Sequence, residues 1–455
     1  MSHSSPGTST VEPNVLKRTL TLRHLIIYGM VMMAPLAPWQ VYGMVAQSSF
    51  NMVPLVYVIG IILMFFTACS YAQMSKEFPN AGSIYTYVSR GINPHVGFVA
   101  GWTLLSDYIL APALLYLFAG LWMSGITPDI PPIVWSLFFL VFNTIINIRG
   151  IETNAKVNLV LFWLQIVSLV VFIGFAIKFI FVDGLGVGSF SVAPFFQAEH
   201  IDMNFIATAV SIVVLGFLGF DGISTLAEEA KDPKKTIGKA SVLALVITGL
   251  IFLVQSYMAA LVHPNFTDLD PDMAFFDIAK EVGGTAYYVV MIIVNVLAVG
   301  IAVTLNVQSS VSRILYAMSR DRVIPGGSFL SKIHPKFQTP VNAILFSSAV
   351  ALIVSSTLSL ETILLFINFG AVTSFMVLNL TVIYYFFVRK GERDGKSIIF
   401  YLLFPLIGFL VCAFVWTGFD MATYVAGFSW IVVGVIVGFI KSKGYKEKSP
   451  VLKDM

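Results

Sequence analysis

The sequence predicts an all-α integral membrane protein with twelve transmembrane helices, on the basis of composition, apolar stretches and charge placement. Of the 455 residues, 57% are hydrophobic and 11% are charged, and the mean hydropathy is +0.87. A soluble domain has about 25% charged residues, which is more than twice this fraction. Long apolar stretches recur along the chain, and most basic residues lie between them.

Twelve apolar stretches approach the length of about 20 residues that a membrane-spanning helix requires. The predicted spans begin near Leu25, Val53, Val96, Ile133, Val157, Phe205, Ser241, Ala286, Val341, Thr362, Ile398 and Met421.

Before the first span, the segment 1–20 begins with a Ser-, Thr- and Pro-rich stretch, and we expect it to be a disordered cytoplasmic N-terminus. It does not have the pattern of a signal peptide, because the apolar stretch after it is too long and no small-residue cleavage site follows. The segment 442–455 is expected to be a cytoplasmic tail.

The basic residues predict the orientation of the chain. If twelve spans are threaded from a cytoplasmic N-terminus, only Lys178 and Lys280 among the loop lysines and arginines lie outside. The loop 265–277 on that outer side contains four aspartates and no basic residue. Because cytoplasmic loops are enriched in Lys and Arg, this asymmetry predicts that both termini are cytoplasmic.

The first span is irregular because it contains the sequence APLAP at 34–38. A proline inside a helix removes a backbone hydrogen bond and clashes with the preceding turn. Pro35 and Pro38 are therefore expected to open the backbone in the middle of this span.

The sixth span is also irregular. Its sequence VVLGFLGFDGISTLAEEA (213–230) contains Gly216, Gly219 and Gly222 together with the acidic residue Asp221. Clustered glycines allow a helix to unwind, and unwound backbone inside a membrane is tolerated where it lines water or protein. A broken helix beside an acid is the arrangement with which transporters hold cations.

Interrupted spans 1 and 6 occupy corresponding positions in two groups of five spans. We therefore expect an inverted repeat with halves 21–185 and 186–390, a site at the bilayer midplane, and two further spans in 391–441. No sequence identity between the halves supports this division, which follows from position and topology.

Two buried carboxylates are the main candidates for ligand binding, since a charged side chain at bilayer depth normally faces a pathway or a partner. Asp221 either contacts the ligand directly or has a structural role, capping the second half of span 6 or pairing with a tyrosine. Asp107 in span 3 either binds a ligand amine or has an internal partner or proton-carrying role.

The prolines of span 1 also limit which ligands fit. Backbone N–H groups at the start of a half-helix bind carboxylates, and proline has none. Carbonyl oxygens, two carboxylates and aromatic rings remain, a set that suits an ammonium ion through charge pairing and cation–π contact. The candidate rings include Trp39, Tyr108 and Phe217; in a chain with 14% aromatic residues, any one such ring is more often a core or lipid-facing ring.

Glu228 and Glu229 end span 6 at the cytoplasmic face, where carboxylates oppose the helix dipole. We expect them to pair with nearby lysines or with Arg313 and to have a structural or gating role. Arg313, in SVSRILYAMSRDRVIP, is expected to be a snorkelling or gate residue on the same face.

Several other classes of function are not indicated. The six histidines have no ligand spacing and Cys69 and Cys412 lie singly in apolar stretches, so no metal site and no cofactor are expected. A net charge of +3 with basic residues in loops does not indicate nucleic-acid binding. No nucleophile–base constellation appears, so an enzyme is not expected.

Three stretches in order, PNAGSIYTYVSRGINPHVGFVAGW, GFLGFDGISTLAEEAKDP and SRILYAMSRDRVIP, resemble the amino acid–polyamine–organocation transporter superfamily over nearly the whole chain. The segments INPHVGF, SDYILAP, HPKFQTP and INFGAVTSF are most similar to its bacterial putrescine importers. The resemblance implies a LeuT-like fold of five plus five inverted spans and transport by alternating access.

The resemblance also implies site residues. Substrate-binding backbone would fall on Pro35, Leu36 and Ala37 in span 1, and carbonyls that hold an ammonium on Leu215, Gly216, Phe217 and Leu218 in span 6. Amino-acid-transporting relatives have a glycine-rich stretch in span 1, and its absence here favours an amine without a carboxylate. Some relatives carry a proton on a span 5 lysine, where this chain has Gln165, so proton coupling would need another group such as Asp107 or Asp221.

We therefore expect a cytoplasmic-membrane importer of putrescine or a similar small amine, with its partners being that substrate and the lipid bilayer. One alternative is an amino acid permease of the same fold, and another is an amine sensor that does not transport. The oligomeric state, the coupling ion and the preferred chain length are not predicted.

Overall fold

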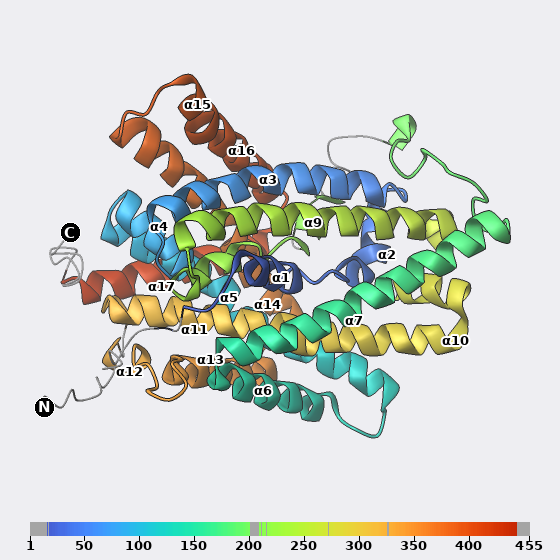
Figure 1. Ribbon diagram of the computed structural model, residues 1–455, viewed down its shortest axis with the longest axis horizontal. Helices are drawn as coiled ribbons and strands as arrows, with labels where there is room; N and C mark the ends of the chain where they lie inside the picture. The colour runs from blue at the N-terminus through green and yellow to red at the C-terminus, as the bar shows by residue number, and fades with distance from the viewer. Residues whose placement is uncertain are drawn as a thin grey trace, which may run out of the picture.

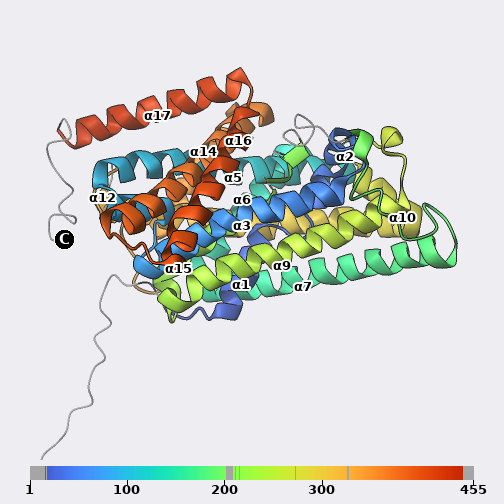
Figure 2. The ribbon, with the colours of Figure 1, turned by 90° about the horizontal axis from the view of Figure 1, so that it is seen from above.

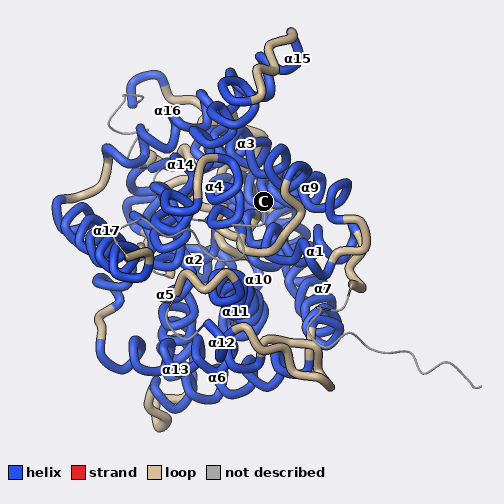
Figure 3. The backbone as a smooth tube through the Cα atoms, turned by 90° about the vertical axis from the view of Figure 1, so that its left-hand side faces the viewer, coloured by secondary structure: helices blue, strands red, loops and turns tan. Residues whose placement is uncertain are grey.

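The computed structural model describes residue 16 and residues 18–200, 209–210, 212–214, 216–271, 273–324 and 327–443. This part of the chain is helical, with one isolated bridge between Leu20 and Ala230 in place of any sheet. The long helices run roughly along one direction and form an elongated bundle (Figure 1). Seen from its end, the bundle shows most of these helices down their axes (Figure 3).

Within the described residues, nine continuous helical stretches are long and apolar enough to cross a membrane. They contain α3 (Val53–Glu77), α5 (Pro94–Ile126), α6 (Pro132–Arg149), α7 (Ile151–Ile177), α9 (Pro233–Val262), α10 (Ala274–Leu297), α11 (Thr304–Arg320), α14 (Leu360–Val382), α16 (Phe404–Thr417) and α17 (Met421–Lys441). Short π-helical segments extend or join them at η1 (Lys178–Val182), η5 (Ala298–Val303), η6 (Ile383–Arg389) and η7 (Ile399–Leu403).

These nine stretches coincide with nine of the predicted spans. The predicted span at Val341 corresponds to α13 (Val341–Thr357), which is 17 residues long. The predicted start at Leu25 falls in the short helix α1 (Leu22–Met32), and that at Phe205 lies outside the described residues. The sequence thus predicted the positions of the long helices correctly.

Short helices lie in the connections of the bundle. They are α4 (Ser83–Gly91), η2 (Ala198–His200), η4 (Phe266–Asp268), α12 (Gly327–Leu330) and α15 (Gly395–Ile398). Side-chain caps start α5 and α17, two of the long helices. The Asn93 side chain accepts hydrogen bonds from the backbone N–H groups of His95 and Val96, both at 3.0 Å, and Pro94 follows it as the first residue of α5. Asp420 caps α17 in the same way, accepting from Thr423 N at 2.8 Å. An N-cap acceptor followed by proline is a favourable helix start.

The first interruption separates α1 from α2 (Pro38–Ser48). Between the two helices the backbone turns, and Ala34 has φ of +52°. The predicted break at the two prolines is therefore present, because Pro35 cannot donate to the preceding turn and Pro38 is suited to begin a new helix. Pro35 lies in the turn and Pro38 is the first residue of α2.

The second interruption follows the helical residues around Val213 and Val214. Residues 217–220 form a turn, Gly219 has φ of +126°, and the 3₁₀ helix η3 (Asp221–Glu229) follows. A positive φ of this size strongly favours glycine, so Gly219 permits the change of direction.

The segment before α1 is more ordered than predicted. The N–H groups of Thr19 and Leu20 both donate to Glu229 O at 3.0 Å, and Lys231 N donates to Leu20 O at 3.0 Å. The expectation of disorder through residue 20 is therefore wrong for these last residues; residues 1–15 lie outside the described part. The reason is tertiary: the end of η3 presents backbone groups that pair with this segment, and composition alone could not reveal them.

One helix lies at the edge of the bundle. Figures 2 and 3 both show α17 along an outer side. α17 packs on α5 and α14, whereas α5 also contacts α4, α6, α11 and α13. α5 is thus a central helix, and it carries Asp107 and Tyr108.

Candidate functional site

The two interruptions lie against each other. A Cβ atom built on Gly216 would lie 3.9 Å from the Cβ of Ala37, and one on Gly219 would lie 2.9 Å from the backbone carbon of Met32. Gly219 therefore serves two purposes, since its positive φ and its missing side chain are both required here. The structure brings the predicted segments of span 1 and span 6 together, except that Leu215 lies outside the described residues.

Asp221 is 2% exposed and lies at the start of η3. Its Oδ1 atom accepts a hydrogen bond from Gly219 N at 3.1 Å, and its Oδ2 atom accepts one from the Tyr108 hydroxyl. These bonds join the interruption in span 6 to α5, and the bond from Tyr108 is the pairing with a tyrosine that the sequence gave as one alternative for Asp221. Tyr108, predicted as an aromatic surface for a cation, contributes its hydroxyl group instead.

Asp107 is 8% exposed, and its carboxyl group has no hydrogen-bond partner in the described part of the chain. Asp107 is the residue before Tyr108, whose hydroxyl donates to Asp221 Oδ2, so both carboxylates lie near the same part of α5. Gly370 of α14 faces its backbone, where a Cβ would lie 2.2 Å from Ser106 Oγ and 3.1 Å from Asp107 N. A buried carboxylate without a partner is costly, so this group requires a cation or a proton.

Backbone groups at the first interruption are largely committed. Ala34 N donates to Val31 O at 3.1 Å, Ala37 N donates to Ala34 O at 2.8 Å, and Pro35 has no N–H. Pro35 O accepts a hydrogen bond from Gln255 Nε2 at 2.8 Å. Among the described residues 34–37, only Leu36 retains an N–H without a recorded partner, which is a poor receptor for a carboxylate.

The second interruption presents the opposite chemistry. Residues 217–220 form a turn directly after Gly216; Gly216 and Leu218 are half-buried, and Phe217 is buried. Where a turn replaces regular helix, backbone carbonyl groups become available to a hydrogen-bond donor or a cation. They adjoin Asp221, which adds a negative charge.

The aromatic candidates are packed in the interior. Trp39 is 1% exposed and stacks on Phe275 with ring centroids 5.3 Å apart. Phe217 is fully buried against Phe252, at a centroid distance of 5.3 Å. Both rings are therefore core side chains in this conformation, which is one of the two roles that the sequence left open. The indole Nε1 of Trp39 has no partner in the described chain.

Glu229 and Arg313 form a buried ion pair at one end of the site, which is one of the pairings that the sequence left open. Arg313 Nε lies 2.5 Å and its Nη2 lies 3.0 Å from the two oxygens of Glu229, and the side chains are 5% and 2% exposed. Arg313 also donates to Ser309 O at 2.8 Å. The geometry is bidentate, the arrangement in which an arginine–carboxylate pair is strongest.

Glu228 pairs with Arg320 rather than with the predicted lysines or Arg313. Nη1 of Arg320 lies 2.9 Å and 3.1 Å from the two Glu228 oxygens, and the side chains are 34% and 17% exposed. Next to it, the Tyr85 hydroxyl donates to Asp321 Oδ2 at 2.7 Å. These contacts connect η3, α11 and α4 at one end of the bundle.

Gln165 is 1% exposed in α7. Its Nε2 donates to Leu161 O at 3.2 Å, and its Oε1 has no partner in the described chain. The amide nitrogen is thus bonded within its own helix, while the amide oxygen has no partner in the described chain.

The sequence reasoning missed two sets of polar residues. Gln255 of α9 supports the first interruption through Pro35 O. In addition, Asn158 Nδ2 donates to Asn306 Oδ1 at 2.7 Å, and the Tyr28 hydroxyl donates to Asn306 O at 2.8 Å, so α7, α11 and α1 are connected. The signal was available, since amide side chains inside long apolar helices need partners.

No group of three or more histidine, cysteine, aspartate or glutamate side chains that could hold a metal ion occurs in the described part of the chain. The polar groups at the site are carboxylates and backbone carbonyls, which accept hydrogen bonds, together with Arg313, which is already paired with Glu229.

The helical bundle, its apolar spans and its buried carboxylates define a multi-pass membrane protein with a polar site between interrupted helices. The amino acid permease family model matches residues 40–441, and the chain belongs to that family of transporters.

Three curated relatives illustrate the range of the family. The low-affinity putrescine importer PlaP of Escherichia coli is 34% identical over the full length of both chains. The branched-chain amino acid permease BcaP of Bacillus subtilis is 24% identical over 86% of each chain. A methylthioribose transporter of Bacillus subtilis is 24% identical over 94% of each chain. The family membership predicted from the three sequence motifs is therefore confirmed.

Proposed function

We propose that this protein imports putrescine or a similar small amine across the cytoplasmic membrane by alternating access. Twelve membrane crossings would form two inverted halves, 21–185 and 186–390, followed by two crossings in 391–441. Both termini would be cytoplasmic, in agreement with the distribution of lysine and arginine. The full-length similarity to a protein named as a putrescine importer supports the choice of substrate.

The observation that best supports an amine is the buried Asp107 carboxyl group without a hydrogen-bond partner in the described chain. An ammonium group is the partner that would satisfy it. The carbonyl oxygens of Gly216, Phe217 and Leu218, with Asp221 beside them, would hold the second ammonium of a diamine. Leu215 completes this segment in the proposal.

The same geometry disfavours an α-amino acid. Its carboxylate would need backbone N–H donors in span 1, and residues 34–37 leave only that of Leu36. A carboxylate would also lie near Asp107 and Asp221, and like charges repel. The amine interpretation therefore fits the donors and acceptors better than an amino acid permease does.

Transport requires a change of conformation, because Asp107 and Asp221 are both buried. The ion pairs Glu229–Arg313 and Glu228–Arg320 would close the cytoplasmic side and separate when the site opens inward. The contact of Leu20 with the end of η3 would have to break or move with them.

The membrane potential would favour uptake. Each positive charge gains about 2.3 kcal/mol per 100 mV, and a dication gains about twice that. Accumulation of putrescine would therefore not require a coupling ion, in keeping with Gln165 in place of a proton-carrying lysine. If protons are coupled, Asp107 or Asp221 would carry them.

The test is a competition panel in proteoliposomes containing the purified full-length protein. Diamines, monoamines and α-amino acids compete against labelled putrescine under an inside-negative potential. The proposal expects strong competition by diamines and weak competition by amino acids. Competition by an α-amino acid but not by its decarboxylated amine would favour the amino acid permease, and binding without flux would favour a sensor.

A further inference from the structure

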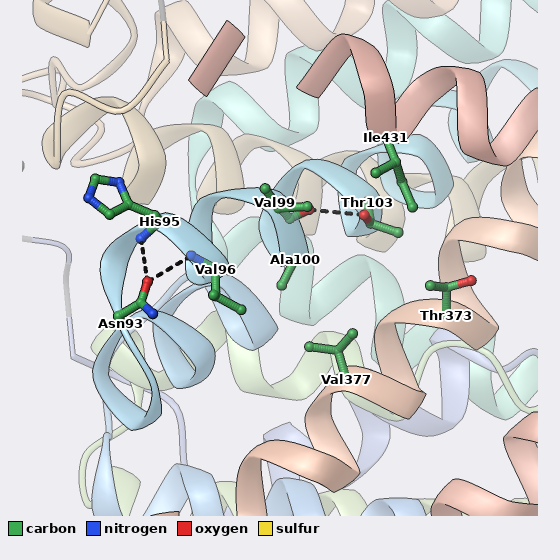
Figure 4. Close-up of a pocket in the computed structure, with 9 residues that line it drawn as sticks. All are labelled: Asn93, His95, Val96, Val99, Ala100, Thr103, Thr373, Val377 and Ile431. Atoms are coloured by element: carbon green, nitrogen blue, oxygen red, sulfur yellow. Dashed lines mark hydrogen bonds between the residues drawn. The ribbon is translucent and has the colours of Figure 1, made fainter. Parts of the chain in front are cut away.

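A groove of about 470 Å³ lies on the outer part of the bundle, away from the two interruptions. Its walls come from α5, α14 and α17, with Val96, Val99 and Ala100 on one side and Val377 and Ile431 on the others (Figure 4). The proposed transport mechanism does not use this groove.

The polar side chains that line the groove are already bonded within the protein. The Thr103 hydroxyl donates to Val99 O at 2.9 Å, and Thr373 Oγ1 accepts from Trp416 Nε1 at 3.2 Å. Asn93 uses its side-chain oxygen to cap α5 (Figure 4). The groove therefore presents mainly hydrocarbon, which suits an apolar chain rather than a polar solute.

The deep end of the groove is closed by tight helix contacts. Trp102 Nε1 donates to Trp430 O at 2.9 Å and Trp430 Nε1 donates to Trp102 O at 2.7 Å, which fastens α5 to α17. Gly370 brings α14 against Ser106 of α5. The groove thus ends below the level of Asp107 and does not belong to the proposed substrate site.

The length of the groove matches one leaflet of a bilayer. From Asn93 to Thr103 α5 rises about 15 Å, at about 1.5 Å per residue. The hydrocarbon core of a bilayer is about 30 Å thick, so each leaflet contributes about 15 Å.

Two basic residues, His95 and Lys441, lie at the level of one end of the groove. Two contacts show that α17 runs antiparallel to α5. Gly427 of α17 packs against Phe369, whose neighbour Gly370 contacts Ser106 of α5. Gly434, further along α17, packs against Trp102, which is earlier in α5. His95 lies seven residues before Trp102 and Lys441 seven residues after Gly434, so both lie about 10 Å from this contact in the same direction. Basic residues at the end of a membrane span attract anionic lipid head groups.

We propose that the groove binds one acyl chain of a bilayer phospholipid whose anionic head group lies between His95 and Lys441. The observations that favour a lipid over a protein partner are the hydrocarbon lining, the length of one leaflet and the two basic residues at the level of one end. The lipid occupies the leaflet next to the lysine- and arginine-rich loops. This inference does not rest on the proposed substrate, because the groove and the carboxylate site are separate.

The experiment measures lipids retained by the full-length protein after purification from vesicles of phosphatidylcholine and phosphatidylglycerol, by native mass spectrometry. The expected result is one phosphatidylglycerol per chain, retained at least about tenfold more than phosphatidylcholine. A tenfold ratio corresponds to a difference in binding free energy of about 1.4 kcal/mol. Val377→Trp fills the groove and should lower this occupancy at least about tenfold. Leu380→Trp is the matched control, because Leu380 lies on the same helix, is 44% exposed and does not line the groove.

A second variant tests the head group. Lys441→Ala should reduce the preference for phosphatidylglycerol over phosphatidylcholine several-fold while a lipid is still retained. Equal phosphatidylglycerol occupancy in the Val377→Trp and Leu380→Trp proteins would overturn the proposal. A dimer that Val377→Trp dissociates would also overturn it, because the groove would then hold a second copy of the chain. Putrescine uptake by each variant is measured separately, so a failure of transport is not confused with loss of lipid.

Discussion

The adjacent residues Glu228 and Glu229 offer a sharp test of how burial sets the strength of an ion pair. Glu229 and Arg313 are 2% and 5% exposed, whereas Glu228 and Arg320 are 17% and 34% exposed. Removing one partner of a buried pair leaves an uncompensated charge and costs about 3–5 kcal/mol. A fully exposed pair contributes about 0.2–1 kcal/mol, and the half-buried pair of Glu228 with Arg320 lies closer to that limit than the pair of Glu229 with Arg313 does.

These energies convert into populations of an inward-open state if the pairs close the cytoplasmic side. A shift of about 1.4 kcal/mol changes an equilibrium about tenfold. Glu229→Gln should therefore raise the open population by about 150-fold to several thousand-fold, until it saturates. Glu228→Gln should raise it by less than about fivefold.

The assay uses a cysteine introduced at Ser224, which is 1% exposed within η3. Cys69 and Cys412, both buried, are replaced by alanine in the background protein. The modification rate of Ser224→Cys by a membrane-impermeant thiol reagent, added from the cytoplasmic side of inverted vesicles, follows the open population.

The control is thermal stability in detergent, which shows whether Glu229→Gln still yields folded protein. Equal labelling rates in the two variants would refute the assignment of the buried pair as the main gate contact. A labelling rate that falls in Glu229→Gln would refute the direction of the argument.

Three further predictions concern the substrate site. Asp107→Asn should abolish saturable putrescine uptake without loss of expression, because a neutral amide cannot balance an ammonium; normal uptake would remove Asp107 from the site. Tyr108→Phe deletes the hydroxyl that donates to Asp221, and a hydrogen bond to a charged group contributes about 1.5–3 kcal/mol, so uptake efficiency should fall about 10- to 150-fold; an unchanged kcat/KM would contradict it. Replacing Pro35 and Ala37 by glycine should let some α-amino acids compete with putrescine, by restoring backbone donors; unchanged selectivity in the competition panel would count against the donor argument.

Much of the fold could be predicted from the sequence. The length of an apolar stretch and the charges beside it can be read from that stretch alone. Nine spans were therefore located correctly. The two interruptions were also predictable, because Pro35 and Gly219 restrict or relax the backbone wherever they occur. The ion pair of Glu229 with Arg313 was among the predicted alternatives because few charged residues occur in this chain and buried charges need partners.

The pairing of side chains across helices depended on the tertiary structure. The sequence identified Tyr108 and Asp221 separately, 113 positions apart, and did not specify that one donates to the other. The support of Pro35 by Gln255 and the pairing of Thr19 and Leu20 with Glu229 were not foreseen. These contacts depend on which helices become neighbours and on how they rotate, which periodicity within one helix does not encode.

The sequence by itself determined that this chain lies in a membrane, which stretches form helices and where two of them break, because these properties follow from transfer of each residue out of water and from local backbone chemistry. Only the tertiary structure decided which polar groups are satisfied and which remain free. Asp107 is buried and has no hydrogen-bond partner among the described residues, whereas Asp221 accepts from Tyr108; whether a buried group finds a partner is a property of the whole fold.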